Sequence, residues 1–284
     1  MSYINSGMGR LVRAVLDPVM LEQIQPRGKN LLDIGCGEGY FTRVLKASGA
    51  ARVVGRDISP ELIKKALEQD PGGEYQVRDI SADPPGAPDS FDAVSACMVL
   101  MDLPDLDSAY RGISASLVPS GKFVACMINP YYSYPVGEWR KTLRSGLHRQ
   151  LEAKCGMLRR IVRQLKEVVT GDYERILSIG NYFDNRVSTK MLGETATLHF
   201  HKPFSDYLNV ARKYDLVLER LIEPQISPEL YAQNASQLLA QALVTVPLFV
   251  VLVFSKSETS RDELQEDERV ANAASNVPFV VDPQ

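Results

Sequence analysis

Three glycines at alternate positions follow directly after a short apolar segment: residues 31–41 read LLDIGCGEGYF. Glycine allows a tight turn and brings backbone N–H groups close to a ligand. A GxG pattern also fits a dinucleotide fold, but the nicotinamide and flavin fingerprint is GxGxxG, which this spacing does not match. Asp33 precedes the first glycine by two residues. Its carboxylate would repel a pyrophosphate and attract a ligand that carries positive charge.

Two more carboxylates follow at the ends of predicted strands. Asp57 lies 18 residues past Gly39, where a carboxylate can accept both ribose hydroxyls in a bidentate manner. Its alternative role is to cap the following helix. Asp79 ends the next predicted strand and is followed by the apolar Ile80. For Asp79 the alternative is an ordinary loop position, with Asp83 as a nearby competitor.

The elements that would position these residues alternate between strand and helix. We expect strands over 30–35, 52–57, 75–79, 91–97 and 122–129, helices over 40–47, 60–69 and 106–117, and a leading helix within 5–25. This alternation predicts parallel βαβ units, and right-handed crossovers then give a doubly wound sheet. Strands over 216–222 and 245–254 would complete it as an edge pair.

The ordered set of motifs over residues 30–129 resembles the class I S-adenosylmethionine-dependent methyltransferases of small-molecule type. The resemblance implies an α/β, Rossmann-like, doubly wound fold with a mostly parallel seven-stranded sheet. It also implies S-adenosyl-L-methionine as cofactor and S-adenosyl-L-homocysteine as product. The cofactor-binding residues that it implies are Asp33, Gly35, Cys36, Gly37, Gly39, Tyr40, Asp57, Ile58, Asp79, Ile80 and Cys97.

The second half of the chain offers candidates for the substrate side. Residues 198–208 read LHFHKPFSDYL and are similar to a segment of many small-molecule methyltransferases, in which a basic or imidazole-bearing loop precedes a helix. His199 and His201 share one face of a strand, so either could be a catalytic general base, and packing is the alternative. Tyr131, Tyr132 and Tyr134 follow the fifth strand and are candidate substrate-binding residues, with simple packing as the alternative.

Asn129-Pro130-Tyr131-Tyr132 is similar to the (D/N)PPY box of amino methyltransferases, but that box follows the fourth strand and this sequence follows the fifth. We therefore reject the match. Residues 138–170 are basic and predicted to be helical, with nine Lys and Arg against three Glu over 138–167. This stretch is interpreted as a solvated helix face, a lid or a homodimer contact.

We expect four parts of the chain. Residues 1–130 form the cofactor-binding core with its N-terminal helix, and residues 131–201 form an inserted, substrate-facing lid of helices and strands. Residues 202–256 complete the core sheet, and residues 257–284 form a disordered acidic tail. The apolar run 238–254 is short and interrupted, so it predicts a buried strand and not a membrane span.

Composition narrows the class of partner. The chain has 284 residues, 45% of them hydrophobic, and a net charge of −3, which argues against a nucleic-acid partner. Its four cysteines lack disulfide or zinc spacing, and no secretory signal is seen, so we expect a cytoplasmic protein. No metal site is expected, because no cluster of carboxylates follows the fourth strand.

The expected reaction is transfer of a methyl group to an oxygen or nitrogen, less readily a carbon, of a small-molecule metabolite by in-line displacement. Two alternatives stay open. The first is an enzyme that uses the bound cofactor for cyclisation or isomerisation of a natural product. The second is a methyltransferase that acts on RNA or protein.

Overall fold

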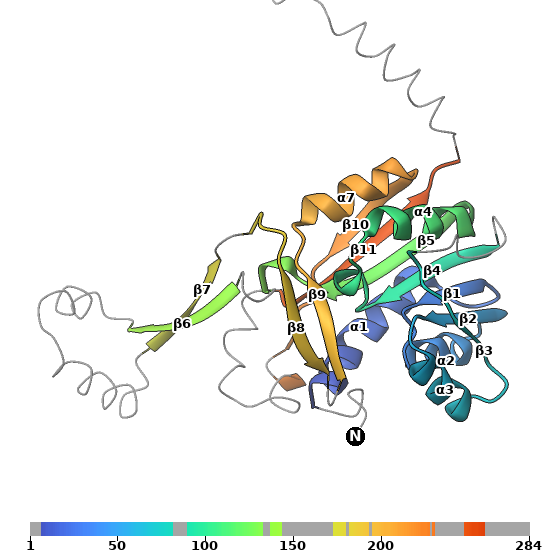
Figure 1. Cartoon of the computed structure of the whole chain (residues 1–284), viewed down its shortest axis with the longest axis horizontal. Helices are drawn as coiled ribbons and strands as arrows, with labels where there is room; N and C mark the ends of the chain where they lie inside the picture. The colour runs from blue at the N-terminus through green and yellow to red at the C-terminus, as the bar shows by residue number, and fades with distance from the viewer. Residues whose placement is uncertain are drawn as a thin grey trace, which may run out of the picture. The chain divides into compact units, whose positions relative to one another are not determined.

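The structure, a computed structural model, describes residues 7–81, 90–132, 137–143, 173–179, 182–192, 195–227, 229–230 and 247–258 (Figure 1). The described residues form two compact units. The first, which we call the sheet unit, lies within 16–127, 204–222 and 250–284. The second, the insertion unit, lies within 1–15, 128–203 and 223–249.

A seven-stranded sheet forms the centre of the sheet unit. Its strands, in spatial order, are β10 (Leu216–Ile222), β11 (Phe249–Lys256), β5 (Leu117–Ile128), β4 (Phe91–Cys97), β1 (Asn30–Ile34), β2 (Arg52–Asp57) and β3 (Glu74–Val77). The five strands from β5 to β3 are parallel to their neighbours, and β10 is antiparallel to β11. The predicted mostly parallel, seven-stranded sheet with its antiparallel edge pair is therefore confirmed.

The direction in which strands are added reverses between β1 and β4. After β1 the chain adds β2 and β3 on one side, then returns to place β4 on the other side of β1. Open α/β sheets bind ligands in the crevice outside the carboxyl ends of the strands at such a reversal. The glycine turn follows β1, so the topology places it at this edge.

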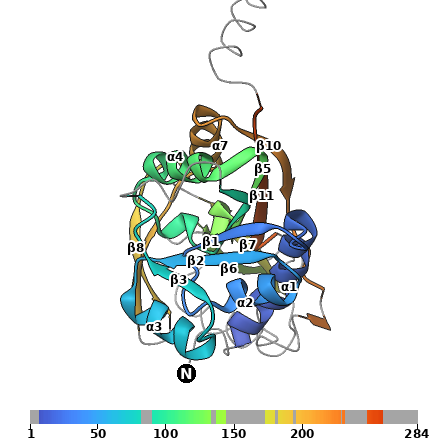
Figure 2. The ribbon, with the colours of Figure 1, turned by 90° about the vertical axis from the view of Figure 1, so that its right-hand side faces the viewer.

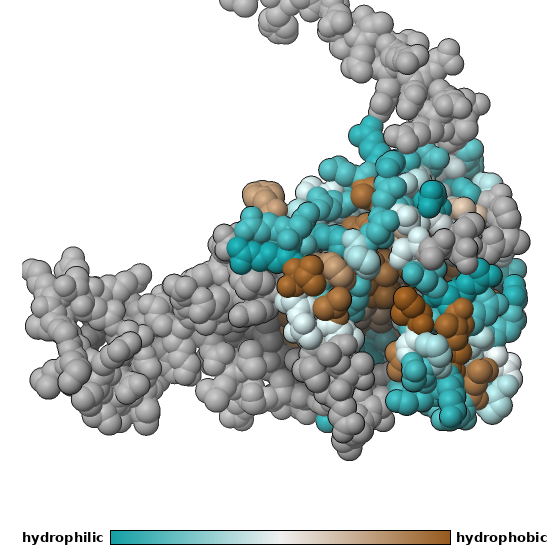
Figure 3. Space-filling view, in the orientation of Figure 1, coloured by the Kyte–Doolittle hydropathy of each residue, from teal (hydrophilic) through white to brown (hydrophobic). Residues whose placement is uncertain are grey.

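Helices cover both faces of the sheet. The helices α2 (Tyr40–Ala47) and α3 (Pro60–Gln69) lie on one face, and α4 (Leu106–Ser116) and α7 (Phe204–Lys213) lie on the other (Figures 1 and 2). Ser59 caps α3, because its side chain accepts from the Leu62 N–H at 3.3 Å. The surface over α3 is mainly hydrophilic (Figure 3), whereas its Ile63 and Ala66 are buried.

Three aromatic rings join α4 to the centre of the sheet. The ring centroids of Tyr110 and Phe123 are 5.5 Å apart in an edge arrangement, and Phe123 stacks on Phe254 at 5.7 Å. All three side chains are fully buried. Edge and offset arrangements of this kind are the favourable ones for aromatic pairs, so this cluster fixes β5 and β11 under α4.

The insertion unit contains two antiparallel strand pairs among its described residues. They are β6 (Gly137–Leu143) with β7 (Tyr173–Ile179), and β8 (Val187–Leu192) with β9 (Thr195–Phe200). The helix expected from residue 138 is therefore wrong for 138–143, where Trp139, Thr142 and Leu143 suit a strand. Residues 144–172 lie outside the described residues, and the lid role of 131–201 stays a prediction.

Several expected boundaries shift in the structure. The strand expected over 75–79 ends at Val77. The strand expected from Lys122 begins at Leu117, because the turn at Pro119–Gly121 lies inside it as a bulge, with Ser120 at φ 60°. Ser257, the first residue of the expected tail, donates its N–H to the Asp215 carbonyl at 2.9 Å.

The leading helix is α1 (Gly7–Ile24), close to the expected range. None of the helices in the described part of the chain is long and apolar enough to cross a membrane.

Candidate functional site

The glycine turn between β1 and α2 depends on backbone that other residues rarely adopt. Gly35, Gly37 and Gly39 have φ of 62°, 55° and 74°. A Cβ on Gly35 would lie 2.4 Å from Val99 Cγ2, and one on Gly39 would lie 2.7 Å from the Tyr75 ring. A Cβ on Gly37 would meet nothing within 4 Å. Gly35 and Gly39 are thus required by packing, whereas Gly37 faces open space that a ligand can use.

Asp57 holds the tip of this turn. Its Oδ2 accepts from the Gly37 N–H at 2.8 Å, and its Oδ1 accepts from the Ser59 N–H at 2.9 Å. One carboxylate therefore joins the end of β2 to the glycine turn and to the start of α3. Each carboxylate oxygen has a second lone pair, so Asp57 can still accept the two ribose hydroxyls expected of it.

Asp33 lies beneath the turn and not at its surface. Its side chain is buried, and its two oxygens accept from Thr42 Oγ1 and Ser95 Oγ, each at 2.7 Å. Burial raises the pKa of Asp33 to about 6, although the two hydroxyl donors act in the opposite direction. The expected attraction to a positively charged ligand stays a prediction, and the contacts present are structural.

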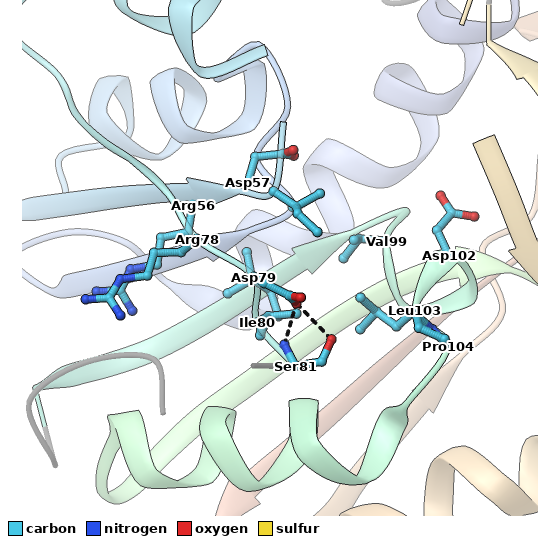
Figure 4. A pocket seen from close by; sticks show the side chains of 13 residues that line it. Arg56, Asp57, Arg78, Asp79, Ile80, Ser81, Val99, Asp102, Leu103 and Pro104 are labelled. Atoms are coloured by element: carbon cyan, nitrogen blue, oxygen red, sulfur yellow. Dashed lines mark hydrogen bonds between the residues drawn. The ribbon is translucent and has the colours of Figure 1, made fainter. Parts of the chain in front are cut away.

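A cavity of about 170 Å³ opens at the carboxyl ends of β1, β2 and β4 (Figure 4). Its lining includes four of the predicted cofactor residues at the ends of β2 and β3, namely Asp57, Ile58, Asp79 and Ile80, together with Gly35. The volume is smaller than that of a typical site for a whole cofactor. Its mixture of carboxylates and apolar side chains suits a nucleoside, which has hydroxyl donors and a flat apolar ring.

Asp79 is held in a turn at the floor of this cavity. Its Oδ1 accepts from both the backbone N–H and the hydroxyl of Ser81, at 2.8 and 2.9 Å. In Figure 4 these two bonds point the Asp79 carboxylate toward Ser81, while the guanidinium groups of Arg56 and Arg78 lie on the side of the cavity away from Asp102. Arg56 is buried and donates from Nε to Gln76 Oε1 at 2.9 Å.

The other predicted cofactor residues are not among the residues that line this cavity. Cys36 is buried, and burial, together with the carboxylates of Asp33 and Asp57, raises the pKa of its thiol. The Tyr40 hydroxyl donates to Asp17 Oδ2 at 2.6 Å. Cys97 ends β4, with its Sγ 3.3 Å from that of Cys126. All three cysteines are free, as expected, and Cys155 lies outside the described residues.

Sequence reasoning missed the third wall of the cavity. It is formed after β4 by Val99, Asp102, Leu103 and Pro104. Met98 takes φ 59° directly before them, which turns the chain back toward Gly35. A positive φ at methionine leaves no signal in sequence, since methionine rarely adopts it.

The predicted substrate-side residues lie in the insertion unit. His199 and His201 are buried, with 1% and 2% of their surfaces exposed, whereas the neighbouring Leu198 in β9 is 53% exposed. The predicted common face of the two histidines is thus the buried one. The rings of Tyr131 and Tyr182 are 5.1 Å apart. Nothing is described of the Tyr132 side chain, and Tyr134 lies outside the described residues.

His201 has a defined tautomer. Its Nε2 lies 2.8 Å from the Tyr182 carbonyl oxygen. A carbonyl only accepts, so Nε2 carries the proton, and Nδ1 of the neutral ring is an acceptor. The geometry is that of an imidazole oriented by a backbone carbonyl.

The chain is similar to known methyltransferases in sequence and in fold. Residues 32–125 match the methyltransferase domain family. The chain is 34% identical over 125 residues to the ubiquinone biosynthesis O-methyltransferase of Xanthomonas axonopodis pv. citri (strain 306), a match that covers 40% of this chain and 51% of that protein. The chain thus spans about half the length of the curated relative it matches.

Solved structures share the fold. An S-adenosylmethionine-dependent methyltransferase from Mesorhizobium loti superposes with a TM-score of 0.63 at 20% identity, over 89% of this chain and 100% of that one. Geranyl diphosphate C-methyltransferase from Streptomyces coelicolor A3(2), in complex with Mg²⁺, geranyl diphosphate and S-adenosyl-L-homocysteine, gives 0.51 at 16% identity over 85% of this chain and 78% of that one. At these identities the likeness concerns the fold alone.

Proposed function

We propose that this chain, whose core is that of the class I S-adenosylmethionine-dependent methyltransferases, transfers a methyl group to an oxygen or nitrogen of a small molecule. The observation that carries the proposal is the cavity at the carboxyl edge of the sheet, where a turn of three glycines at positive φ meets Asp57, Ile58 and Asp79. The small-molecule class rests on the resemblance of residues 198–208 and on the acidic net charge. An oxygen acceptor is supported by the similarity to the ubiquinone biosynthesis O-methyltransferase.

The described residues fit the cofactor. Gly37 leaves open space beside a turn whose flanking glycines are packed, so the backbone there can approach a ligand. Asp57 would hold the ribose hydroxyls, because its two oxygens are already oriented by backbone N–H groups. Ile58 and Ile80 would pack on the adenine ring, and Asp79 would accept from its amino group.

When bound, S-adenosyl-L-methionine supplies an activated methyl group whose sulfonium leaves readily. The chain itself then has to orient the acceptor and exclude water. His201 would take the proton of a hydroxyl nucleophile at Nδ1, since Nε2 is committed to the Tyr182 carbonyl. His199 is the second candidate for this role, and no metal is proposed.

The decisive experiment measures cofactor binding and product mass separately. Calorimetry with S-adenosyl-L-homocysteine tests the cavity, and mass spectrometry of a metabolite panel incubated with S-adenosyl-L-methionine tests for the gain of one methyl. Binding without any methylated product, but with an isomerised one, would favour the cyclisation alternative. Methylation of RNA or protein in place of metabolites would replace the small-molecule proposal, and absence of cofactor binding would overturn the proposal as a whole.

A further inference from the structure

Asn129 follows β5 directly and is fully buried, with 0% of its surface exposed. Its backbone N–H donates to the Leu248 carbonyl at 2.9 Å. Its side-chain Oδ1 accepts from the Tyr131 N–H at 3.1 Å. Both bonds hold the residue in place at the end of the strand.

The side-chain Nδ2 of Asn129 has no hydrogen-bond acceptor among the described protein atoms. The orientation of the amide is settled, because only Oδ1 can accept from the Tyr131 N–H, and this leaves Nδ2 as the remaining group. Buried polar side-chain atoms are nearly always paired, and leaving a donor unpaired costs about 1–3 kcal/mol. A fully buried, pre-oriented amide donor therefore indicates an acceptor that comes from outside the chain.

The surroundings of Asn129 in the insertion unit are aromatic. Tyr131 follows it by two residues, and the Tyr131 ring lies 5.1 Å from that of Tyr182. The Tyr182 ring lies 5.8 Å from the His201 imidazole, edge to face. Through the Tyr131 backbone N–H, these contacts link Asn129 to two phenol rings and to one imidazole, whose Nδ1 is an acceptor.

We propose that Asn129 is a substrate-positioning residue, whose Nδ2 donates to an oxygen of a planar aromatic substrate that carries a phenol, carbonyl or carboxylate. This rests on the proposed function and adds the substrate class to it. The donor requires an acceptor atom, and a carbonyl, phenolate or carboxylate oxygen is an acceptor of this kind. Aromatic rings favour offset or edge contacts with another ring, so Tyr131 and Tyr182 select a flat ligand.

Asn129→Asp is the sharpest variant, because the carboxylate keeps the acceptor for the Tyr131 N–H but replaces the donor with a second, negatively charged acceptor. The matched control is Asn209→Asp on the exposed side of α7. The probe is 3,4-dihydroxybenzoate, with the non-planar cyclohexane-1,2-diol beside it, each titrated in the presence of S-adenosyl-L-homocysteine. We expect the aromatic probe to bind the unaltered protein at least tenfold more tightly than Asn129→Asp, with the affinity for S-adenosyl-L-homocysteine unchanged.

A second measurement does not depend on the variant folding. In the ¹⁵N-labelled unaltered protein, the Asn129 side-chain NH₂ resonances, assigned by selective labelling, should shift downfield when the aromatic probe is added. Three results would overturn the inference. The first is that S-adenosyl-L-homocysteine binds but neither probe does, and the second is that the diol binds as tightly as the aromatic probe. The third is that the Asn129 resonances do not shift although the aromatic probe binds. Failure of S-adenosyl-L-homocysteine to bind the unaltered protein would instead defeat the proposed function.

Discussion

Thr42 Oγ1 donates a 2.7 Å hydrogen bond to Asp33 Oδ2, and this bond spans the base of the glycine turn. Asp33 belongs to β1 before the turn, and Thr42 belongs to the first turn of α2 after it. Because the other Asp33 oxygen accepts from Ser95 on β4, one buried carboxylate joins three elements around the cofactor turn. Asp33 therefore acts on the site through the shape of the turn.

The first prediction tests the Thr42–Asp33 bond. Thr42→Val keeps the shape of the side chain and removes the hydroxyl, so Asp33 is left with one donor fewer in a buried place. We expect a loss of about 1–3 kcal/mol in the free energy of unfolding and a weaker affinity for S-adenosyl-L-homocysteine. Denaturant unfolding and calorimetry measure the two effects. An unchanged affinity in a folded variant would mean that the bond does not shape the turn.

The second prediction concerns the pH dependence of stability. The folded pKa of Asp33 is raised to about 6 from 3.8, so between these values the folded protein keeps a proton that the unfolded chain has lost. Stability from this group is therefore fully present below pH 3.8 and falls as pH rises through 6, by on the order of 2–3 kcal/mol in total. Relative to Asp33→Asn, the unaltered protein should lose this amount between pH 4 and pH 7 in denaturant unfolding. Parallel pH curves for the two proteins would show that burial does not shift this group.

The third prediction separates two glycines of the turn. Gly37→Ala and Gly39→Ala both place alanine at positive φ, but only the Gly39 Cβ would collide with Tyr75. We expect Gly39→Ala to lower the melting temperature by several degrees more than Gly37→Ala. Gly37→Ala should instead lower the affinity for S-adenosyl-L-homocysteine by tenfold or more, because its methyl group enters the open space. Equal melting temperatures together with unchanged affinities would contradict this division of roles.

The sequence allowed the sheet and its helices to be predicted closely, because the local signals were strong. Ser59 and Pro60 mark the start of α3, and the alternation of apolar strands with amphipathic helices specifies parallel βαβ units. Gly35, Asp57, Ile58, Asp79 and Ile80 could be placed at the cavity for the same reason. Each is found at the carboxyl end of a strand whose position the pattern gives.

Contacts between distant segments could not be read in the same way. The Ser95 and Thr42 hydroxyls that hold Asp33 are ordinary strand and helix residues in sequence, and the wall after β4 depends on a positive φ at Met98. Residues 138–143 carry mixed propensities, and pairing with β7 places them in a strand. Tertiary pairing routinely overrides such weak local preferences.

The fourth prediction tests Asp57. Asp57→Asn keeps one acceptor but cannot accept from the Gly37 N–H, the Ser59 N–H and two ribose hydroxyls together. We expect the affinity for S-adenosyl-L-homocysteine to fall by roughly 1–3 kcal/mol in calorimetry. The control is Asp107→Asn, whose carboxylate pairs with Lys213 and Tyr214 away from the cavity and should leave the affinity unchanged. If both variants bind equally well, the ribose assignment is wrong.

The last prediction distinguishes the two histidines by their chemistry. Both are buried, and the tautomer of His201 is fixed because its Nε2 donates to the Tyr182 carbonyl. A base needs a lone pair in a fixed place, so His201→Ala should lower turnover by ~10²-fold while S-adenosyl-L-homocysteine binds as before.

His201→Gln keeps a donor for the Tyr182 carbonyl but has no basic nitrogen, so it should preserve the melting temperature without restoring turnover. His199→Gln, within β9 and two residues before His201, is the matched variant, and we expect it to lower turnover by only a few-fold. The pH–rate profile completes the test: the acidic limb that reports the base should disappear in His201→Gln and remain in His199→Gln. If His201→Gln turns over at the rate of the unaltered protein, the imidazole serves packing, and the acceptor's proton leaves by another route.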